Sequence, residues 1–195
     1  CSGCIVKEET KTINWNIEFK KLKKIANSYK SSNNLNYDCI IPVSGGKDSY
    51  FQTYFAIKKL KLNPLLVTYN GHNYLDVGLK NLKNMREIFS CDHYFFTPSR
   101  KIIVEMNRLG FKLAGDPNWH CHLGINTLPT VVAAKFKIPL ILWGEHALDI
   151  SGKNFLSEKI EFTKRERDEK DLRGFKTEDF IKASKFLKKK DLLWS

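Results

Sequence analysis

Residues 39–51, CIIPVSGGKDSYF, connect an apolar run to a segment with helical spacing, and this stretch decides the fold. The apolar run extends over residues 37–43 and predicts a buried strand, while a helix is expected from Asp48 onward. Between them lie two glycines, two serines, one lysine and one aspartate: Ser44, Gly45, Gly46, Lys47, Asp48 and Ser49. A strand that turns at once into a helix leaves main-chain N–H groups without partners at the helix start, where the helix dipole favours an anion. The loop is therefore either an anion-binding site or a tight turn.

The residue types in this loop favour the anion-binding interpretation. Glycines let the main chain approach a phosphate closely and adopt positive φ, the serine hydroxyls can donate hydrogen bonds, and Lys47 supplies a positive charge. Asp48 would repel a phosphate, so we expect it to hold Mg²⁺ or to cap the helix. The Walker A pattern is absent, because no glycine stands five residues before Gly46 and Asp48 occupies the position of its serine or threonine. The dinucleotide-binding pattern Gly-x-Gly-x-x-Gly is absent too, so the loop is of another type.

Four apolar segments predict the strands of a sheet: residues 37–43, 64–70, 92–97 and 139–143. They lack clean alternation and are separated by helical segments, which indicates a Rossmann-like α/β fold with a parallel sheet and helices on both faces. Ligands of such sheets bind outside the carboxyl ends of the strands. We therefore expect the loops after the strands to lie together along one edge: residues 44–49, 70–73, 97–99 and 144–146.

The chain divides into three parts by pattern. Residues 1–36 carry a Cys-x-x-Cys motif and a basic helix, and residues 37–150 hold the predicted sheet. Within the second part, residues 115–124 are predicted to be a loop rich in polar and aromatic groups. Residues 151–195 are charged and predicted to be helical, and we expect them to continue in a longer protein.

The composition narrows the class of protein. A hydrophobic share of 42% with 12% aromatic residues is enough for a core, and no apolar run is long enough to span a membrane. Five unevenly spaced cysteines do not form a disulfide framework, so we expect a cytoplasmic protein. The net charge of +12 is spread evenly over the three parts, whereas a nucleic-acid footprint is clustered; we therefore do not expect a nucleic-acid partner.

The Ser44–Ser49 loop resembles the PP-loop of the ATP pyrophosphatases, which cut ATP between its α and β phosphates. Further blocks resemble the N-acetyl sugar amidotransferases of bacterial surface-polysaccharide synthesis, which includes lipopolysaccharide O-antigen. These blocks agree in order over most of residues 1–183 and comprise residues 37–70, 79–97, 115–119, 138–145 and 172–180.

The resemblance implies a PP-loop domain of the adenine nucleotide alpha hydrolase-like type and a reaction. A sugar acetamido group, on a nucleotide-linked N-acetyl sugar, becomes an acetamidino group at the expense of ATP, with ammonia from a separate glutaminase subunit. The loop would bind ATP, with its pyrophosphate part held by Ser44, Gly45, Gly46, Lys47 and Ser49 and with Mg²⁺ held by Asp48. Lys47 and Asp48 would be catalytic residues. The end of the second strand would lie against adenosine, and its residues are Val67, Thr68 and Tyr69.

Candidate residues outside the loop lie near the fourth predicted strand. Asp116 and Trp119 belong to a resembling block and are candidate substrate residues. The Trp119 ring either stacks on a sugar or base or anchors its loop. His120 opens a His-Cys-His run, which we interpret as a substrate-loop or packing element because consecutive side chains rarely converge on one metal ion. Glu145 and His146 follow the fourth strand. Glu145 is a candidate catalytic residue that binds metal or orients ammonia, with helix capping as its alternative role, and His146 is a candidate substrate residue.

Cys1 and Cys4 are candidate Zn²⁺ ligands, since two Cys-x-x-Cys pairs form a zinc knuckle. Only one such pair stands here, so the alternative interpretation, two terminal thiols, is favoured.

The alternative function is a PP-loop enzyme that modifies tRNA by thiolation or lysidine formation. The positive net charge agrees with it, but a thiolating enzyme needs catalytic thiols, and Cys121 is the only cysteine predicted in a loop near the ligand edge. A nucleotide-binding module without activity is a further alternative.

Overall fold

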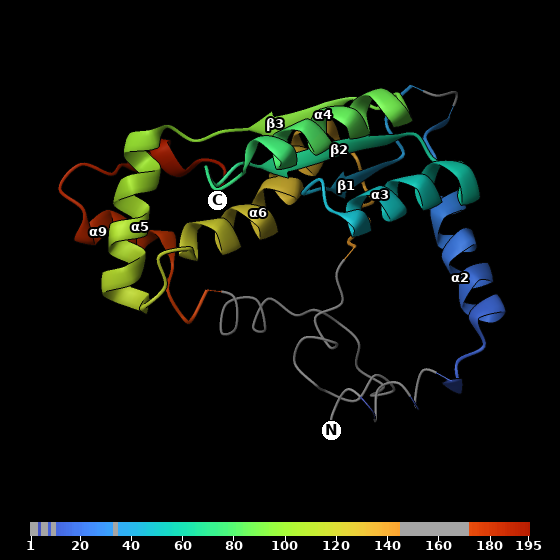
Figure 1. The fold of residues 1–195 in the computed structure, drawn as a ribbon, viewed down its shortest axis with the longest axis horizontal. Helices are drawn as coiled ribbons and strands as arrows, with labels where there is room; N and C mark the ends of the chain where they lie inside the picture. Colours follow the sequence, from blue (N-terminus) through green and yellow to red (C-terminus); the bar gives the residue numbers. More distant parts are fainter. Residues whose placement is uncertain (1–3, 5–7, 9–10, 33–34, 145–171) are drawn as a thin grey trace.

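The computed structural model describes residue 4, residue 8 and residues 11–32, 35–144 and 172–195 of the 195-residue chain (Figure 1). The predictions for Cys1, Glu145 and His146 therefore lie outside the described residues, as do residues 151–171 of the predicted charged extension. Among the helices of the described residues, none combines the length and the apolar character needed to cross a membrane.

The sheet has three parallel strands in the order β1 (Cys39–Pro42), β2 (Pro64–Tyr69) and β3 (His93–Phe96). All six residues of β2 are buried, as expected for the central strand of a sheet covered on both faces. The predicted α/β class with a parallel sheet is thus confirmed at this level.

The fourth predicted strand, residues 139–143, is reduced to a single parallel bridge between Ile141 and Ile40, on the edge of β1 opposite β2. The Ile40 N–H donates to Leu140 O at 2.9 Å, and the Leu142 N–H donates to Ile40 O at 2.9 Å. The next bond of such a ladder would come from the N–H of Pro42, which proline lacks. The pairing therefore ends at Leu142.

Helices flank this sheet (Figure 1). Their bounds are α2 Trp15–Ser28, α3 Lys47–Tyr54, α4 Asp76–Phe89, α5 Arg100–Ala114, α6 Trp119–Phe136 and α9 Thr177–Ala183. A π-helical turn, Phe55–Lys59, extends α3, and a 3₁₀ turn, Lys189–Leu192, lies near the end of the chain.

Alternating residues of the strands belong to two hydrophobic clusters, one on each face of the sheet, because successive side chains of a strand point to opposite faces. Ile40 and Val67 pack with α5, α6 and the C-terminal residues, whereas Ile41 and Leu66 pack with residues of α2, α3 and α4. Cys39 and Cys91 are buried in the second cluster. Both cysteines thus serve as small core residues.

The C-terminal segment belongs to the first cluster. Phe180 is completely buried, and the Trp194 ring lies 4.8 Å from the Tyr69 ring between centroids. The Ser184 hydroxyl donates to the Glu105 carboxylate at 2.7 Å. The charged tail expected from the sequence thus contributes buried aromatic rings to the core that covers β2.

The predicted loop over residues 115–124 is wrong in its second half, because α6 begins at Trp119. The Asp116 carboxylate accepts from the Asn118 N–H at 2.9 Å, and the Cys121 N–H donates to Asn118 O at 2.8 Å. These local bonds start the helix within the polar run. The start of α6 could not be predicted from the sequence pattern, since His-Cys-His shows no apolar periodicity.

Candidate functional site

The Ser44–Ser49 loop follows β1 and depends on glycine at one position above all. Gly45 has φ +80°, and a Cβ there would lie 3.0 Å from Leu82 Cγ and 3.3 Å from Gly78 O of α4. Both the left-handed conformation and the close approach of α4 therefore require glycine. Gly46 is the N-cap of α3 and makes no side-chain cap hydrogen bond.

The two serines of the loop have different surroundings. Ser49 is 8% exposed, and its hydroxyl accepts from the Ser44 N–H at 3.0 Å. The Ser44 and Ser49 hydroxyls lie 3.3 Å apart, while Ser44 itself is exposed. Ser49 thus holds the loop in shape from inside, and Ser44 is the serine that faces solvent.

Lys47 and Asp48 stand at the start of α3 with their charges in water. Their side chains are 89% and 73% exposed and form an ion pair of 2.8 Å. An ion pair this exposed contributes little to stability, so both groups can re-pair with a ligand at little cost. The expected capping role of Asp48 is not seen, because Gly46 is the N-cap.

Asp48 fits the predicted role as a Mg²⁺ ligand. Mg²⁺ is commonly bound by one or two carboxylates together with substrate phosphates, rather than by an all-protein cage. The exposed Asp48 carboxylate beside a helix start supplies such a donor. Within the described part of the chain, no group of three or more His, Cys, Asp or Glu side chains is placed to hold a metal ion.

Two of the loops predicted to meet at the carboxyl edge are in contact. The Asn70 amide donates to the Thr97 hydroxyl at 3.2 Å, and His72 Nε2 donates to Pro98 O at 2.8 Å, which joins the loops after β2 and β3. On the other side of β1, Gln52 Nε2 of α3 donates to Leu142 O at 2.6 Å. The chain leaves β1 toward β2 and returns on the opposite side at Ile141, so the Ser44–Ser49 loop lies at the topological switch point.

The three residues predicted to contact adenosine are enclosed by protein. Val67, Thr68 and Tyr69 are 1%, 2% and 7% exposed. The Thr68 hydroxyl donates to Val43 O at 2.6 Å. An adenosine at this strand end would therefore meet main-chain groups.

Those main-chain groups can be placed from the hydrogen bonds on either side. The Val43 N–H donates to Val67 O, and the Asn70 N–H donates to Phe96 O, so odd residues of β2 face β1 and even residues face β3. Tyr69 then directs its N–H and C=O toward the β1 side, just beyond Val43. This is the side on which the Ser44–Ser49 loop begins.

Asp116 and Trp119, predicted near substrate, are structural anchors here. Asp116 is 7% exposed and its carboxylate is contacted by the Asn118 N–H and by Arg173 Nε at 3.2 Å. Trp119 is completely buried, stacks on Phe180 with ring centroids 4.0 Å apart, and donates from Nε1 to Leu172 O. The protein thus already uses the ring and the N–H of Trp119, which favours the anchor interpretation.

His120 is also buried, at 1% exposure, and its Nδ1 lies 3.1 Å from the Tyr69 hydroxyl. Burial lowers the pKa of His120 to about 4, with further lowering by His72 and His122, so the ring is neutral at pH 7. A Cβ on Gly71 would lie 3.6 Å from His120 Cε1. His120 thus packs against the loop after β2 and supports it.

Cys121 is buried in the first turns of α6. Burial and the Asp116 carboxylate raise the pKa of its thiol to about 11. A thiol with a raised pKa carries little thiolate at neutral pH and is a poor nucleophile. The burial of Cys121 thus gives no support to the thiolation alternative.

Cys4, the second candidate zinc ligand, is exposed, and its partner Cys1 lies outside the described residues. The zinc site stays a prediction, as do the roles of Glu145 and His146.

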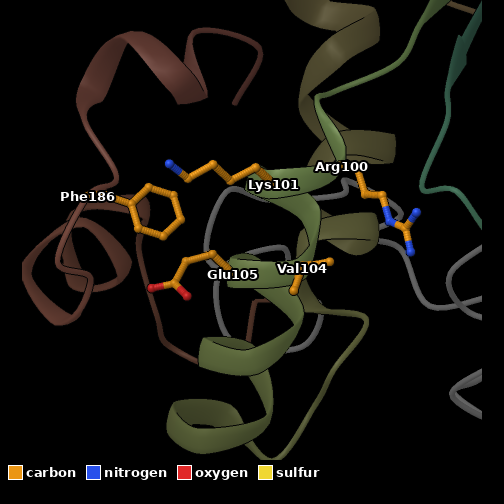
Figure 2. A pocket seen from close by; sticks show the side chains of 5 residues that line it. All are labelled: Arg100, Lys101, Val104, Glu105 and Phe186. Carbon is orange, nitrogen blue, oxygen red and sulfur yellow. The ribbon is translucent and has the colours of Figure 1, made fainter.

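A groove of about 390 Å³ lies apart from the Ser44–Ser49 loop, between α5 and the C-terminal segment (Figure 2). In this view the Phe186 ring lies between the Lys101 and Glu105 side chains, and Lys101 Nζ is 4.4 Å from the ring centroid. No residue that lines the groove belongs to the predicted site.

The sequence did not indicate that Gln52 of α3 donates a hydrogen bond to Leu142 O beside the Ser44–Ser49 loop. The signal that was present is Pro42, a residue without an N–H at the end of a predicted inner strand, which leaves a carbonyl of the neighbouring segment in need of another donor. Which side chain provides that donor depends on the packing of α3.

No family model matches the chain, and no curated protein was found to match it.

Proposed function

We propose that this chain is an ATP-dependent, AMP-forming amidotransferase that converts the acetamido group of a nucleotide-linked N-acetyl sugar into an acetamidino group. The observation that carries the proposal is the Ser44–Ser49 loop. In this loop Gly45 has a left-handed main chain, and Gly46 is the N-cap of α3 and has no side chain to cap the helix. Lys47 and Asp48 are exposed at the start of the helix. The loop lies at the topological switch point, where ligands of open parallel sheets bind.

The reaction needs activation of an amide, because an amide carbonyl is a poor electrophile. The amide oxygen attacks the α-phosphorus of ATP, pyrophosphate leaves, and loss of the amide proton gives an O-adenylyl imidate. Ammonia adds to the imidate carbon, AMP leaves with the former amide oxygen, and an acetamidine remains.

In this reaction the loop would bind and neutralise the departing pyrophosphate. The Lys47 ammonium and the main-chain N–H groups at the start of α3 would bind its oxygens. Asp48 would hold Mg²⁺, which when bound supplies further charge neutralisation at the same phosphates. Ser49 would keep the loop in shape through its bond to the Ser44 N–H.

The adenosine would lie over the end of β2, against the main chain of Val67–Tyr69. Ammonia would come from a separate glutaminase subunit, as the family resemblance implies, and the enzyme would work in the cytoplasm on surface-polysaccharide precursors such as those of lipopolysaccharide. Glu145 remains a proposed catalytic residue.

The test is incubation of the protein with ATP, Mg²⁺, ammonium chloride and UDP-N-acetylglucosamine or a related acetamido nucleotide sugar. We expect AMP and pyrophosphate as products. Mass spectrometry should show a sugar in which an NH group has replaced one oxygen. Formation of ADP, or AMP formation that requires tRNA, would contradict the proposal.

A further inference from the structure

The four tryptophans of the chain fall into two pairs. Trp119 and Trp194 are 0% and 5% exposed and belong to the core. Trp15 of α2 and Trp143 are 58% and 43% exposed. Trp143 is the exposed indole at the carboxyl edge of the sheet, since it follows directly on the segment that pairs with β1.

A single exposed aromatic ring is ordinary on a protein surface, but the main chain at Trp143 is held in an unusual way. Leu142 O would accept from the N–H of Pro42 in a regular ladder, and Pro42 has none. Gln52 Nε2 takes that place at 2.6 Å. A side chain of α3, slightly more than one turn after Lys47, therefore replaces the missing ladder bond.

Gly144 shows how closely this segment lies against α3. A Cβ at Gly144 would be 2.5 Å from Gln52 Oε1 and 3.0 Å from its Cδ. Trp143 is thus fixed between two residues that contact the same side chain. The Gln52–Leu142 hydrogen bond ties the position of the indole to the helix that begins at the Ser44–Ser49 loop.

The strand order indicates which substrate lies on the Trp143 side of the Ser44–Ser49 loop. β2, where the adenosine is proposed to lie, is on one side of β1, and the segment ending in Trp143 is on the other. In-line attack on the α-phosphorus comes from the side opposite the departing pyrophosphate. Because the adenosine would fill the space over β2, the side of β1 away from β2 is left for the attacking molecule. That molecule is the acetamido sugar.

We propose that Trp143 is the surface on which the sugar ring of the acetamido substrate stacks, and that Gln52 is the positioning residue that holds it there. This inference rests on the proposed function. A pyranose presents an apolar C–H face that an indole can cover, while its hydroxyls stay in water. Trp119, for which the sequence left stacking and anchoring both open, is completely buried, so its ring is not available to a sugar.

Fluorescence gives a direct binding test, because a Trp15→Phe variant leaves Trp143 as the one exposed indole of the four. We expect UDP-N-acetylglucosamine to change the emission of this variant, and UDP or ATP with Mg²⁺ to change it much less. The Trp15→Phe/Trp143→Phe double variant is the matched control and should not respond. A response to UDP as large as that to UDP-N-acetylglucosamine would assign the ring to a base and overturn the sugar assignment; the absence of any response would overturn the proposal.

Kinetics separate the stacking role from a structural one. Trp143→Ala should raise the KM for the nucleotide sugar by about tenfold, the size of a lost ring contact, with the KM for ATP unchanged. Trp143→Phe should restore most of the loss. Phe111→Ala, which removes a 67% exposed ring from α5, is the control and should change neither constant. An equal rise of both constants, or no rise, would contradict the proposal.

The positioning role of Gln52 is tested by Gln52→Leu, which keeps the volume and removes the donor. It should raise the KM for the nucleotide sugar, as Trp143→Ala does, and hydrogen exchange at the Ile40 and Leu142 amides, which join β1 to this segment, should become faster. Unchanged sugar KM together with faster exchange would leave Gln52 a merely structural residue. If the parent protein forms no AMP, the proposed function fails; if AMP forms while Trp143→Ala behaves like the parent, only this inference fails.

Discussion

The Ser44–Ser49 loop and the Asp116–Cys121 segment are both short polar runs that the sequence marks as candidate sites, yet the structure treats them in opposite ways. In the second segment, Asp116, Trp119 and His120 are each less than 10% exposed and their polar atoms have protein partners. In the loop, Lys47 and Asp48 are mostly in water and contact each other. A polar run is available to a ligand only where the protein has not already used its donors and acceptors.

The largest effect expected from this comparison is on stability at the second segment. Trp119→Ala removes a completely buried ring that stacks on Phe180, and should lower the free energy of unfolding by about 3–5 kcal/mol. Urea unfolding measures this. Trp119→Phe keeps a ring and should cost less, and neither variant should change the sugar KM of the folded protein. A Trp119→Phe variant of full stability with a raised sugar KM would show that the residue contacts substrate after all.

At the loop the expected effect is on activity. Lys47→Ala should reduce AMP formation by about 10²–10³-fold, as for the loss of one charge-stabilising donor. The melting temperature should not change, because the side chain is 89% exposed. Lys58→Ala, further along the same helical segment and also exposed, serves as the control. Pyrophosphate release at the parental rate would refute the assignment of the loop.

Gly45→Ala tests whether the loop conformation is itself required. The left-handed backbone should cost about 1–2 kcal/mol, and the new Cβ would also press on Leu82. Gly115 is a matched control, because it has φ +65° but a Cβ added there would have no neighbouring atom within 4 Å. The difference in unfolding free energy between the two alanine variants isolates the contact with α4, and equal losses would mean that this contact is unimportant.

The smallest effect expected is a pH dependence at the second segment. Burial lowers the pKa of His120 to about 4 in the folded chain, below its usual value near 6.5, so the unfolded chain binds the proton more readily. The stabilising contribution is complete above pH 6.5 and decreases as the pH falls toward 4. Because His93 shifts in the same direction, also through burial, a His120→Gln variant should show a shallower loss of stability, not a flat one. If stability decreased with falling pH as steeply in the variant as in the parent, His120 would not be a source of the pH dependence.

Much of the fold could be predicted because the relevant signals are local. Three of the four expected strands form in the expected parallel arrangement, and the loop after the first begins a helix at Lys47. Long apolar runs between helical segments leave few other architectures. The fourth strand was predicted too long, since the pattern PLILW contains no information on Pro42, its partner across the sheet.

The candidate site could be predicted only at the loop. Asp116 and Trp119 have the residue types of a substrate site, but α6 and the C-terminal segment enclose them. Conversely, Gln52 and Trp143 carry no motif, and they come together because α3 and residues 139–144 flank β1 on the same side.

The sequence by itself determined the three strands of the sheet and the turn from the first strand into a helix, since strand pattern, a glycine pair and a helix start act over a few residues. Only the tertiary structure decided which polar and aromatic groups remain open to a ligand. Burial and hydrogen-bond satisfaction depend on chain segments distant in sequence: Phe180 covers Trp119, Trp194 covers Tyr69, and Gln52 completes the bond that Pro42 cannot make.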